Sequence, residues 1–114
     1  MNEVLIVLSA ADTWTRADGS KYRSGVWAEE LVVMHERLAK AGYPIDIATP
    51  AGVPPTIDPH SMNPKVVGQA NVDHFRSYLD SIAAALARPL VLAEVDTTRY
   101  AAVVIPGGHG PVEE

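Results

Sequence analysis

Short runs of apolar and β-branched residues constrain the fold of this chain most strongly. Val4 to Leu8 and Ala101 to Ile105 are continuously apolar, and Tyr43 to Ala48 is a third strand-like run. Strands without alternating polar positions are typical of parallel sheets, in which other elements cover both faces. We therefore predict three buried strands at these positions.

The segment from Gly25 to Ala41 has the periodicity of an amphipathic helix. Its large apolar residues recur every three or four positions, which places them on one helical face. These residues are Trp27, Leu31, Met34 and Leu38. Ser24 is a suitable N-cap and Gly42 a suitable C-terminal stop. A helix between two strands predicts a βαβ unit, so the first two strands should run parallel.

A second helix is predicted over Asn71 to Ala87, with Asn71 or Asp73 near its N-terminal cap. Two other segments lack periodicity. Ser9 to Ser24 is polar and is expected to form an irregular loop. Five prolines between Pro50 and Pro64 exclude a regular helix or a central strand there. Long irregular segments of this kind often carry function.

This order of elements predicts one α/β domain, residues 1–114, with helices on both faces of a parallel sheet. Ligands of such sheets bind beyond the carboxyl ends of the strands. Three irregular segments leave from those ends: Ser9–Ser24, Thr49–Pro64 and the residues from Gly107 onward. We therefore expect these three segments to meet at one rim and to form the functional site.

The composition excludes several classes of function. The 114 residues include 9 Lys and Arg against 14 Asp and Glu, a net charge of −5, which does not suit a nucleic-acid partner. They include no cysteine, so they offer no disulfide, thiolate metal site or thiol nucleophile. The N-terminal apolar run is too short for a signal or a membrane span, and we expect a cytoplasmic protein with no membrane partner.

Glu30 is the acidic residue of the first helix best placed for chemistry. At about 100° per residue, Glu29 and Glu36 fall opposite the apolar stripe, whereas Glu30 falls on its shoulder near the rim. A carboxyl group partly withdrawn from water at this place is a candidate proton shuttle. The alternative is a structural acid whose side chain reaches water or pairs with Arg37 or Lys65.

Gly107 and Gly108 directly follow the third predicted strand. Because glycine has no Cβ, backbone N–H groups there can face a ligand and form an oxyanion hole. The alternative is a plain tight turn. His60 and His109 lie on the same rim, either as ligand contacts or as solvated loop histidines. The chain has no histidine pair at helical spacing, so we predict no metal site.

Four blocks of sequence stand in an order that resembles a known family. They are Val4–Ser9, Ser24–Leu31, Ala48–Pro55 with Asp58, Pro59 and Ser61, and Val104–Pro111. Together they resemble the ThiJ/PfpI superfamily, which has the class I glutamine amidotransferase-like fold. The resemblance is greater to the glyoxalase III and heat-shock-chaperone branch than to the protease branch.

The resemblance implies a flavodoxin-like three-layer sandwich and a Cys-His-Glu active site. The family's glutamate matches Glu30, its oxyanion-hole glycine matches Gly108, and Gly107 and His109 match the same substrate-binding turn. Members of this branch convert 2-oxoaldehydes such as methylglyoxal to 2-hydroxy acids such as lactate, a D-lactate dehydratase type of activity, with no added cofactor. Stress-response relatives have also been described as removing sugar adducts from proteins and as holdase chaperones, and many form homodimers.

The family nucleophile lies on an Ala-x-Cys-His-Gly elbow that follows the Gly-Gly turn. These 114 residues contain neither that cysteine nor its histidine. We therefore expect the N-terminal half of an incomplete domain, inactive alone, whose partner is a complementing C-terminal half or a second copy. A sheet edge left uncovered would limit its independent stability.

Two other functions stay open from the sequence. An exposed half-core suits a non-enzymatic holdase chaperone or interaction module, whose action would not depend on Glu30. An unrelated nucleotide or phosphate binder of flavodoxin-like fold is disfavoured because the chain has neither a Walker A nor a G-x-G-x-x-G loop.

Overall fold

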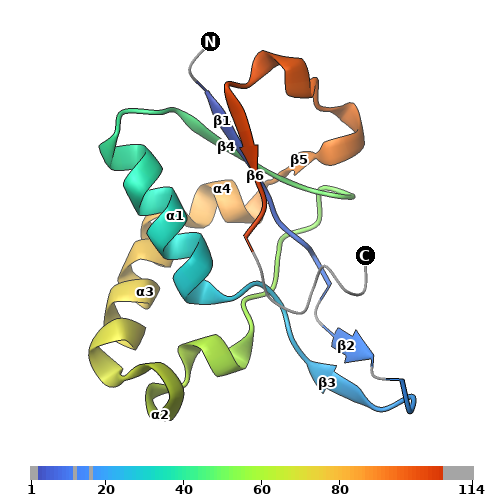
Figure 1. Ribbon diagram of the computed structural model, residues 1–114, viewed down its shortest axis with the longest axis vertical. Helices are drawn as coiled ribbons and strands as arrows, with labels where there is room; N and C mark the ends of the chain where they lie inside the picture. Colours follow the sequence, from blue (N-terminus) through green and yellow to red (C-terminus); the bar gives the residue numbers. More distant parts are fainter. Residues whose placement is uncertain (1–2, 12, 16, 107–114) are drawn as a thin grey trace.

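A four-stranded parallel sheet organises the structure (Figure 1). The computed structural model describes residues 3–11, 13–15 and 17–106. The strand order is β5-β4-β1-β6, and a separate antiparallel pair, β2-β3, lies outside the sheet. The strands are β1 (Val4–Val7), β2 (Thr13–Thr15), β3 (Lys21–Arg23), β4 (Ile45–Thr49), β5 (Leu90–Val91) and β6 (Ala102–Val104). The α-helices are α1 (Ala28–Lys40), α2 (Pro64–Val67), α3 (Gln69–Ser81) and α4 (Ala83–Ala87). The 3₁₀ turns are η1 (Pro59–Met62), η2 (Leu92–Glu94) and η3 (Thr97–Arg99).

β1 lies between β4 and β6, and this confirms the predicted parallel pairing. Ile6 is aligned with Ile47 on one side and Val104 on the other. Leu5 and Ile6 are fully buried, as expected for a strand covered on both faces. The three predicted strands are all present, with bounds that differ from the prediction by one or two residues. The α/β class with a parallel sheet is therefore confirmed.

The long helices cover one face of the sheet. Ile6, Ile47 and Val104 belong to one apolar cluster with residues of α1, α3 and α4. The helical residues of this cluster are Leu31, Leu38, Leu79 and Leu86. In the sheet, β4 lies next to β1 and β5 lies next to β4, so both connections move toward the same edge of the sheet. Because crossovers between parallel strands are right-handed, the helices in these two connections lie on the same face of the sheet. Figure 1 shows α1 and α3 together on this side of the strands.

The opposite face carries the return from β5 to β6. This connection, residues 92–101, runs back past β4 and β1 and contains η2 and η3. The Tyr100 hydroxyl donates to the Asp46 carboxylate at 2.7 Å, which fixes the connection to β4. Burial and the Asp46 carboxylate raise the pKa of Tyr100 to about 12. The helices expected on this second face are therefore replaced, in the described part of the chain, by short 3₁₀ turns.

The C-terminal end of α1 follows the prediction. Gly42 has φ of +89°, a left-handed conformation that glycine adopts without strain. Its N–H donates to the Ala39 carbonyl at 3.0 Å, and the Tyr43 N–H donates to the Leu38 carbonyl at 3.2 Å. These two bonds form a Schellman motif, which ends the helix and directs the chain into β4.

The buried side of α1 is wider than the predicted stripe. Ala28 and Val32 are fully buried against Phe75 of α3, in addition to the residues that face the sheet. Glu36, expected in solvent, is partly buried and lies 3.4 Å from His74 of α3. The apolar periodicity of α1 identifies the helical face that packs on the sheet. It does not identify the contact of Ala28 and Val32 with Phe75, which exists only because α3 packs beside α1.

Three segments differ from their predicted structure. Residues 9–24, expected to be irregular, contain the β2-β3 hairpin, whose turn has Gly19 at φ of +86°. The predicted helix 71–87 starts earlier, at Gln69 after Gly68, and is interrupted at Ile82. β5 is an additional strand of two residues, too short to show periodicity.

A polar cluster joins α1 to α3. His35 Nδ1 lies 2.7 Å from the Tyr78 hydroxyl, and the two rings meet edge-on with centroids 5.5 Å apart. Partial burial lowers the pKa of His35 because it disfavours the imidazolium form. Burial and the nearby Glu36 carboxylate raise the pKa of Tyr78. The His74 ring lies near the same Tyr78 ring, with centroids 6.4 Å apart and a tilt of 44°, so both helices contribute titratable groups to this contact.

The lowered pKa of His35 predicts that acid weakens the fold. In the unfolded chain His35 has a pKa near the usual value of about 6.5, so it binds a proton more readily than in the folded protein. The contribution of His35 to the free energy of unfolding is therefore full above about pH 6.5 and is lost as the pH falls below that value. We expect the urea midpoint to decrease between about pH 7.5 and about pH 5.5. His35→Gln should reduce this pH dependence, whereas His60→Gln, at an exposed position, should leave it in place. An equal slope in wild type and His35→Gln would contradict the assignment.

Candidate functional site

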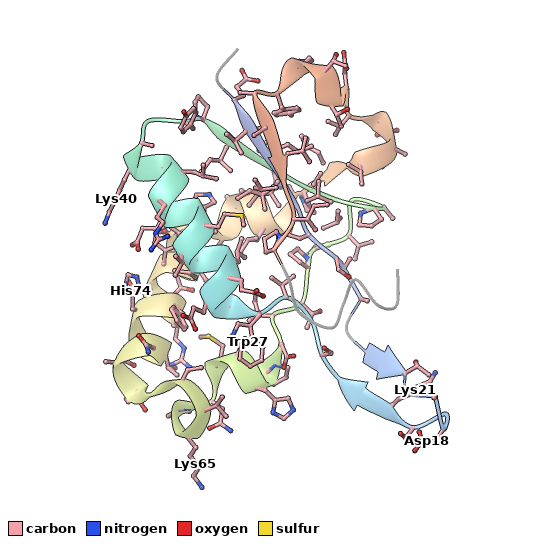
Figure 2. All side chains as sticks on the ribbon, viewed as in Figure 1. Asp18, Lys21, Trp27, Lys40, Lys65 and His74 are labelled. Atoms are coloured by element: carbon pink, nitrogen blue, oxygen red, sulfur yellow. The ribbon has the colours of Figure 1, made fainter. Side chains whose placement is uncertain are left out.

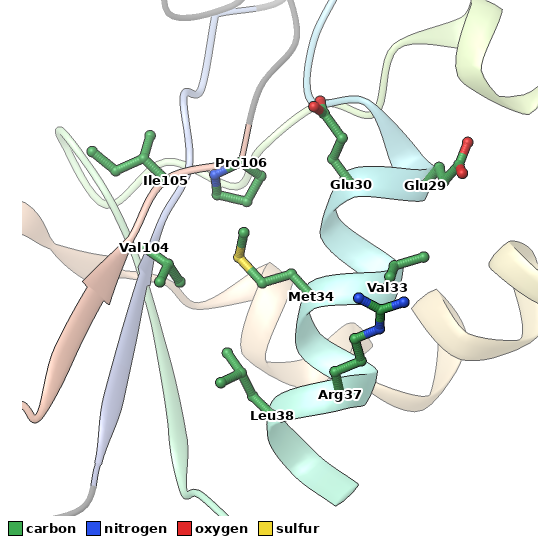
Figure 3. A pocket seen from close by; sticks show the side chains of 9 residues that line it. All are labelled: Glu29, Glu30, Val33, Met34, Arg37, Leu38, Val104, Ile105 and Pro106. Carbon is green, nitrogen blue, oxygen red and sulfur yellow. The ribbon is translucent and has the colours of Figure 1, made fainter. Parts of the chain in front are cut away.

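A groove lies where α1 passes the end of β6. It has a volume of about 540 Å³ and is open to solvent (Figure 3). Its floor and walls are mainly apolar, and its charged residues are Glu29, Glu30 and Arg37. The apolar residues are Val33, Met34, Leu38, Val104, Ile105 and Pro106. The groove therefore joins the first turns of α1 to the residues that immediately precede Gly107.

Glu30 lies at the end of this groove nearest the helix N-terminus. Figure 3 shows its side chain extending beyond the first turn of α1, whereas Glu29 points away from Pro106. The Glu30 side chain is exposed, so the prediction that its carboxyl group is partly withdrawn from water is wrong. The reason is that the groove is open: no described residue covers the carboxylate.

The two ion pairs considered for Glu30 are absent from the described residues. Arg37 shares the groove with Glu30 without forming a salt bridge to it. Lys65, on α2, extends away from the body of the molecule (Figure 2). Glu30 therefore keeps its carboxylate available at the groove.

The long loop after β4 packs against the segment that enters α1. The Val26 N–H donates to the Thr56 carbonyl at 2.8 Å, and the Asp58 N–H donates to the Val26 carbonyl at 2.8 Å. Gly25 permits this approach, because a Cβ at that position would lie 2.2 Å from the Thr56 oxygen. The two segments thus form a parallel bridge, which fixes where α1 begins.

The N-terminus of α1 is capped by a distant serine. The Ser61 hydroxyl accepts from the Ala28 N–H at 3.0 Å and donates to the Asp58 carbonyl at 2.6 Å. The predicted cap, Ser24, is wrong, because Trp27 is the N-cap residue and the Ser24 hydroxyl donates to the Asp58 carboxylate at 3.3 Å. Ser24, Asp58 and Ser61 are all buried, so these bonds are shielded from water.

The Asp58 side chain organises the loop as well as its contact with α1. One carboxylate oxygen accepts from the His60 N–H at 2.9 Å and so caps η1, and the other accepts from Ser24. His60 itself is exposed, in agreement with a solvated loop histidine. An Asp-Pro pair followed by serine is typical of a capped turn, but the long-range role of Ser61 has no local signal.

The remaining predicted site residues, Gly107, Gly108 and His109, lie outside the described residues. Their neighbour Pro106 is buried and lines the same groove as Glu30. Met34, which sequence analysis assigned only to the apolar stripe, also lines the groove. The first two of the three expected segments meet through Ser24 and Asp58, and Pro106, the residue before the third, lines the groove together with Glu30.

The described residues contain no cluster of three or more His, Asp or Glu side chains suited to a metal ion. Within the same ranges, no helix is both long and apolar enough to span a bilayer. The groove therefore offers the Glu30 carboxylate at one end, an apolar wall along α1, and Pro106, which precedes Gly107 in the sequence.

Known proteins share both the sequence and the fold of this chain. No protein-family model matches it. The protein/nucleic acid deglycase HchA of Pseudomonas aeruginosa is 34% identical over 95 residues, which is 82% of this chain and 32% of that protein. Glyoxalase III from Candida albicans superposes with a TM-score of 0.76 at 25% identity, covering 99% of this chain and 46% of the other. Over most of its length, this chain is similar in sequence and fold to these homologues of the ThiJ/PfpI superfamily.

A second solved structure gives the same match within the superfamily. The rapid encystment protein of Francisella tularensis superposes with a TM-score of 0.74 at 27% identity, over 96% of this chain and 46% of that one. The chain thus spans about a third of its curated relative and less than half of each solved structure. This coverage is consistent with the N-terminal half of a ThiJ/PfpI fold.

Removal of the Ser61 hydroxyl should loosen the start of α1. Ser61→Ala leaves the Ala28 N–H without its partner in a buried place, and we expect a loss of about 1–2 kcal/mol in the free energy of unfolding. Urea denaturation measures this loss. Ser77→Ala, at an exposed position of α3, is the matched control and should change stability by less than about 0.5 kcal/mol. Equal stabilities of the two variants would show that Ser61 is not the cap.

Proposed function

We propose that this chain carries the carboxylate and the glycine turn of a glyoxalase III-type or deglycase-type site for small reactive aldehydes. The observation that carries the proposal is that Glu30 of α1 and Pro106, which precedes Gly107, line one groove. The names of its relatives, a deglycase and a glyoxalase III, favour the same chemistry. Methylglyoxal is the proposed model substrate, and lactate is the proposed product.

The proposed reaction needs a thiolate, a proton carrier and an oxyanion site. The thiolate adds to the aldehyde carbon of methylglyoxal to give a hemithioacetal. Glu30 takes the proton from that carbon and returns one to the adjacent carbon, which gives a lactoyl thioester. Water then hydrolyses the thioester to lactate and frees the thiol. N–H groups at Gly107 and Gly108 would stabilise the oxygen anions, with His109 beside the substrate.

The thiolate must come from outside these 114 residues, because they contain no cysteine. In this proposal the isolated chain is inactive, a complementing C-terminal half supplies the thiolate, and the protein forms a homodimer as an additional, separate feature. Activity on glycated protein follows from the same aldehyde chemistry. The name of the Pseudomonas aeruginosa relative also includes nucleic acid. The net charge of −5 of this chain disfavours the binding of nucleic acid. Two predictions stay untested: that residues 1–114 are the N-terminal part of a single ThiJ/PfpI-like domain, and that the protein is cytoplasmic.

The role of Glu30 can be tested in a single-chain chimera. This chain replaces the matching segment of Candida albicans glyoxalase III, and lactate formation from methylglyoxal is measured. We expect turnover, and a decrease of at least about 100-fold with Glu30→Gln, because a positioned acid-base group contributes about that much. Glu29→Gln, in the same helical turn but directed away from Pro106, should retain activity. A chimera in which both variants are equally active would refute the role of Glu30.

A holdase function is a second candidate, and one observation favours it. Val103 and Ile105 are large apolar residues that are 41% and 66% exposed. Exposed apolar surface can bind unfolded chains. If this function operates, the chain should suppress aggregation of a test protein, Ile105→Lys should weaken the effect, and Glu30→Gln should leave it unchanged.

A further inference from the structure

Arg37 is the cationic residue of the groove, and the proposed reaction does not use it. It lines the groove together with Glu30 and lies seven residues, about two helical turns, further along α1. Figure 3 shows its side chain extending toward Val33. Arg37 is exposed, and its guanidinium has no hydrogen bond or salt bridge to any described residue. The guanidinium is therefore free to react with a small molecule that enters the groove.

A 2-oxoaldehyde such as methylglyoxal has two adjacent carbonyl carbons, and this pair matches the guanidine group of arginine. Two guanidine nitrogens can add to the two carbons and close a five-membered ring, whereas the single amine of lysine cannot. The 114 residues contain no cysteine that would trap the aldehyde first. The described residues that line the groove include one guanidine group and no side-chain amine. Arg37 is therefore the group of the groove best suited to form a lasting adduct.

The surroundings of Arg37 favour such an adduct. The groove walls are mainly apolar, and Val33 and Met34 lie one turn before Arg37 on α1. The guanidinium is charged, whereas the ring that it forms with an oxoaldehyde is neutral at neutral pH, and a neutral group costs less to withdraw from water. With a volume of about 540 Å³, the groove has room for a three-carbon aldehyde beside Arg37, which raises the local concentration of the aldehyde.

Two other exposed arginines provide a comparison within the same chain. Arg88 is exposed and is not among the residues that line the groove. Arg99 lines a different cleft of about 330 Å³, whose other lining residues include Glu94 and Asp96. Exposure alone would make these two arginines react as fast as Arg37. A preference for Arg37 would therefore report the groove rather than accessibility.

We propose that Arg37 is a modification site for 2-oxoaldehydes. Two of its guanidine nitrogens form bonds to the two carbonyl carbons of methylglyoxal, and one water molecule and one proton leave. The aldehyde carbon is oxidised to the carbonyl carbon of the ring, and the ketone carbon is reduced to a C–H carbon, so the step needs no outside oxidant. The product is a neutral hydroimidazolone, which removes the positive charge that Arg37 gives to the groove beside Glu29 and Glu30. The inference rests on the proposed function for the class of aldehyde, but not on Glu30 or on a thiolate.

Peptide mapping by mass spectrometry tests the modification on the full 114-residue chain. The folded chain is incubated with methylglyoxal at a level that modifies less than one arginine per molecule on average. The ring is recognised by the added mass of methylglyoxal less one water. We expect Arg37 to react at least about fivefold faster than Arg88 and Arg99, because the groove holds the aldehyde beside it. A synthetic peptide of residues 33–41, which has no groove, should react at the rate of Arg88.

Arg37→Lys is the matched variant, because it keeps the positive charge but cannot close the ring. It should show no ring at position 37 and unchanged modification of Arg99. A preference for Arg37 in the folded chain that is lost in the peptide supports the proposal. Equal rates at Arg37, Arg88 and Arg99, or a peptide that reacts as fast as the folded chain, overturns it. Turnover by the chimera without this preference rejects the modification site alone, and the preference without turnover rejects the proposed reaction alone.

Discussion

The parallel pairing of β1 with both β4 and β6 is the constraint on which the rest of the structure depends. β1 is buried on both faces, and its helix α1 leads to β4, while β6 lies on the other side. The first turn of α1 and the end of β6 therefore meet at the place where the strand order reverses. Ligands of open α/β sheets bind at such a switch point. The position of the groove follows from topology before any particular side chain is considered.

The start of α1 is then fixed by buried polar bonds from the loop after β4. Asp58 and Ser61 contact the helix entry through Ser24 and Ala28, at separations of more than thirty residues in sequence. Gly25 allows the two backbones to approach. This arrangement explains why an irregular, proline-rich segment is ordered: its turns serve to hold the N-terminus of α1, and with it Glu30, beside β6.

The sequence predicts the local features well and the long-range contacts poorly. The apolar runs give β1, β4 and β6, and helical periodicity gives α1 with its glycine stop, because each depends on neighbours in sequence. Ser24 was a reasonable cap by position, yet Ser61 caps the helix, since only the folded loop brings it there. The β2-β3 hairpin lies outside the prediction, because its strands have three residues each and five residues separate Thr15 from Lys21, more than in the two-residue Asp-Gly turn that signals a hairpin. The burial of Glu30 depends on what covers the groove, which periodicity cannot show.

The family adds chemistry that geometry alone does not contain. The resemblance to the ThiJ/PfpI superfamily, confirmed by the comparisons, directs attention to Glu30 among three acids on one helix. The structure adds the surroundings within the described residues: an open, mainly apolar groove, no salt bridge to the Glu30 carboxylate, and a sheet edge at β6 with no further strand. An acid exposed in this half is consistent with a site that becomes enclosed only when the fold is complete.

The central claim is that the first turns of α1 and the end of β6 form one site, and nuclear Overhauser contacts test it most directly. A chain labelled at methionine methyl groups should show cross-peaks from the Met34 methyl to Pro106 and Val104, with Glu30 side-chain protons near Pro106. Cross-peaks from Met34 only to residues of α3, with none to Pro106 or Val104, would contradict the account.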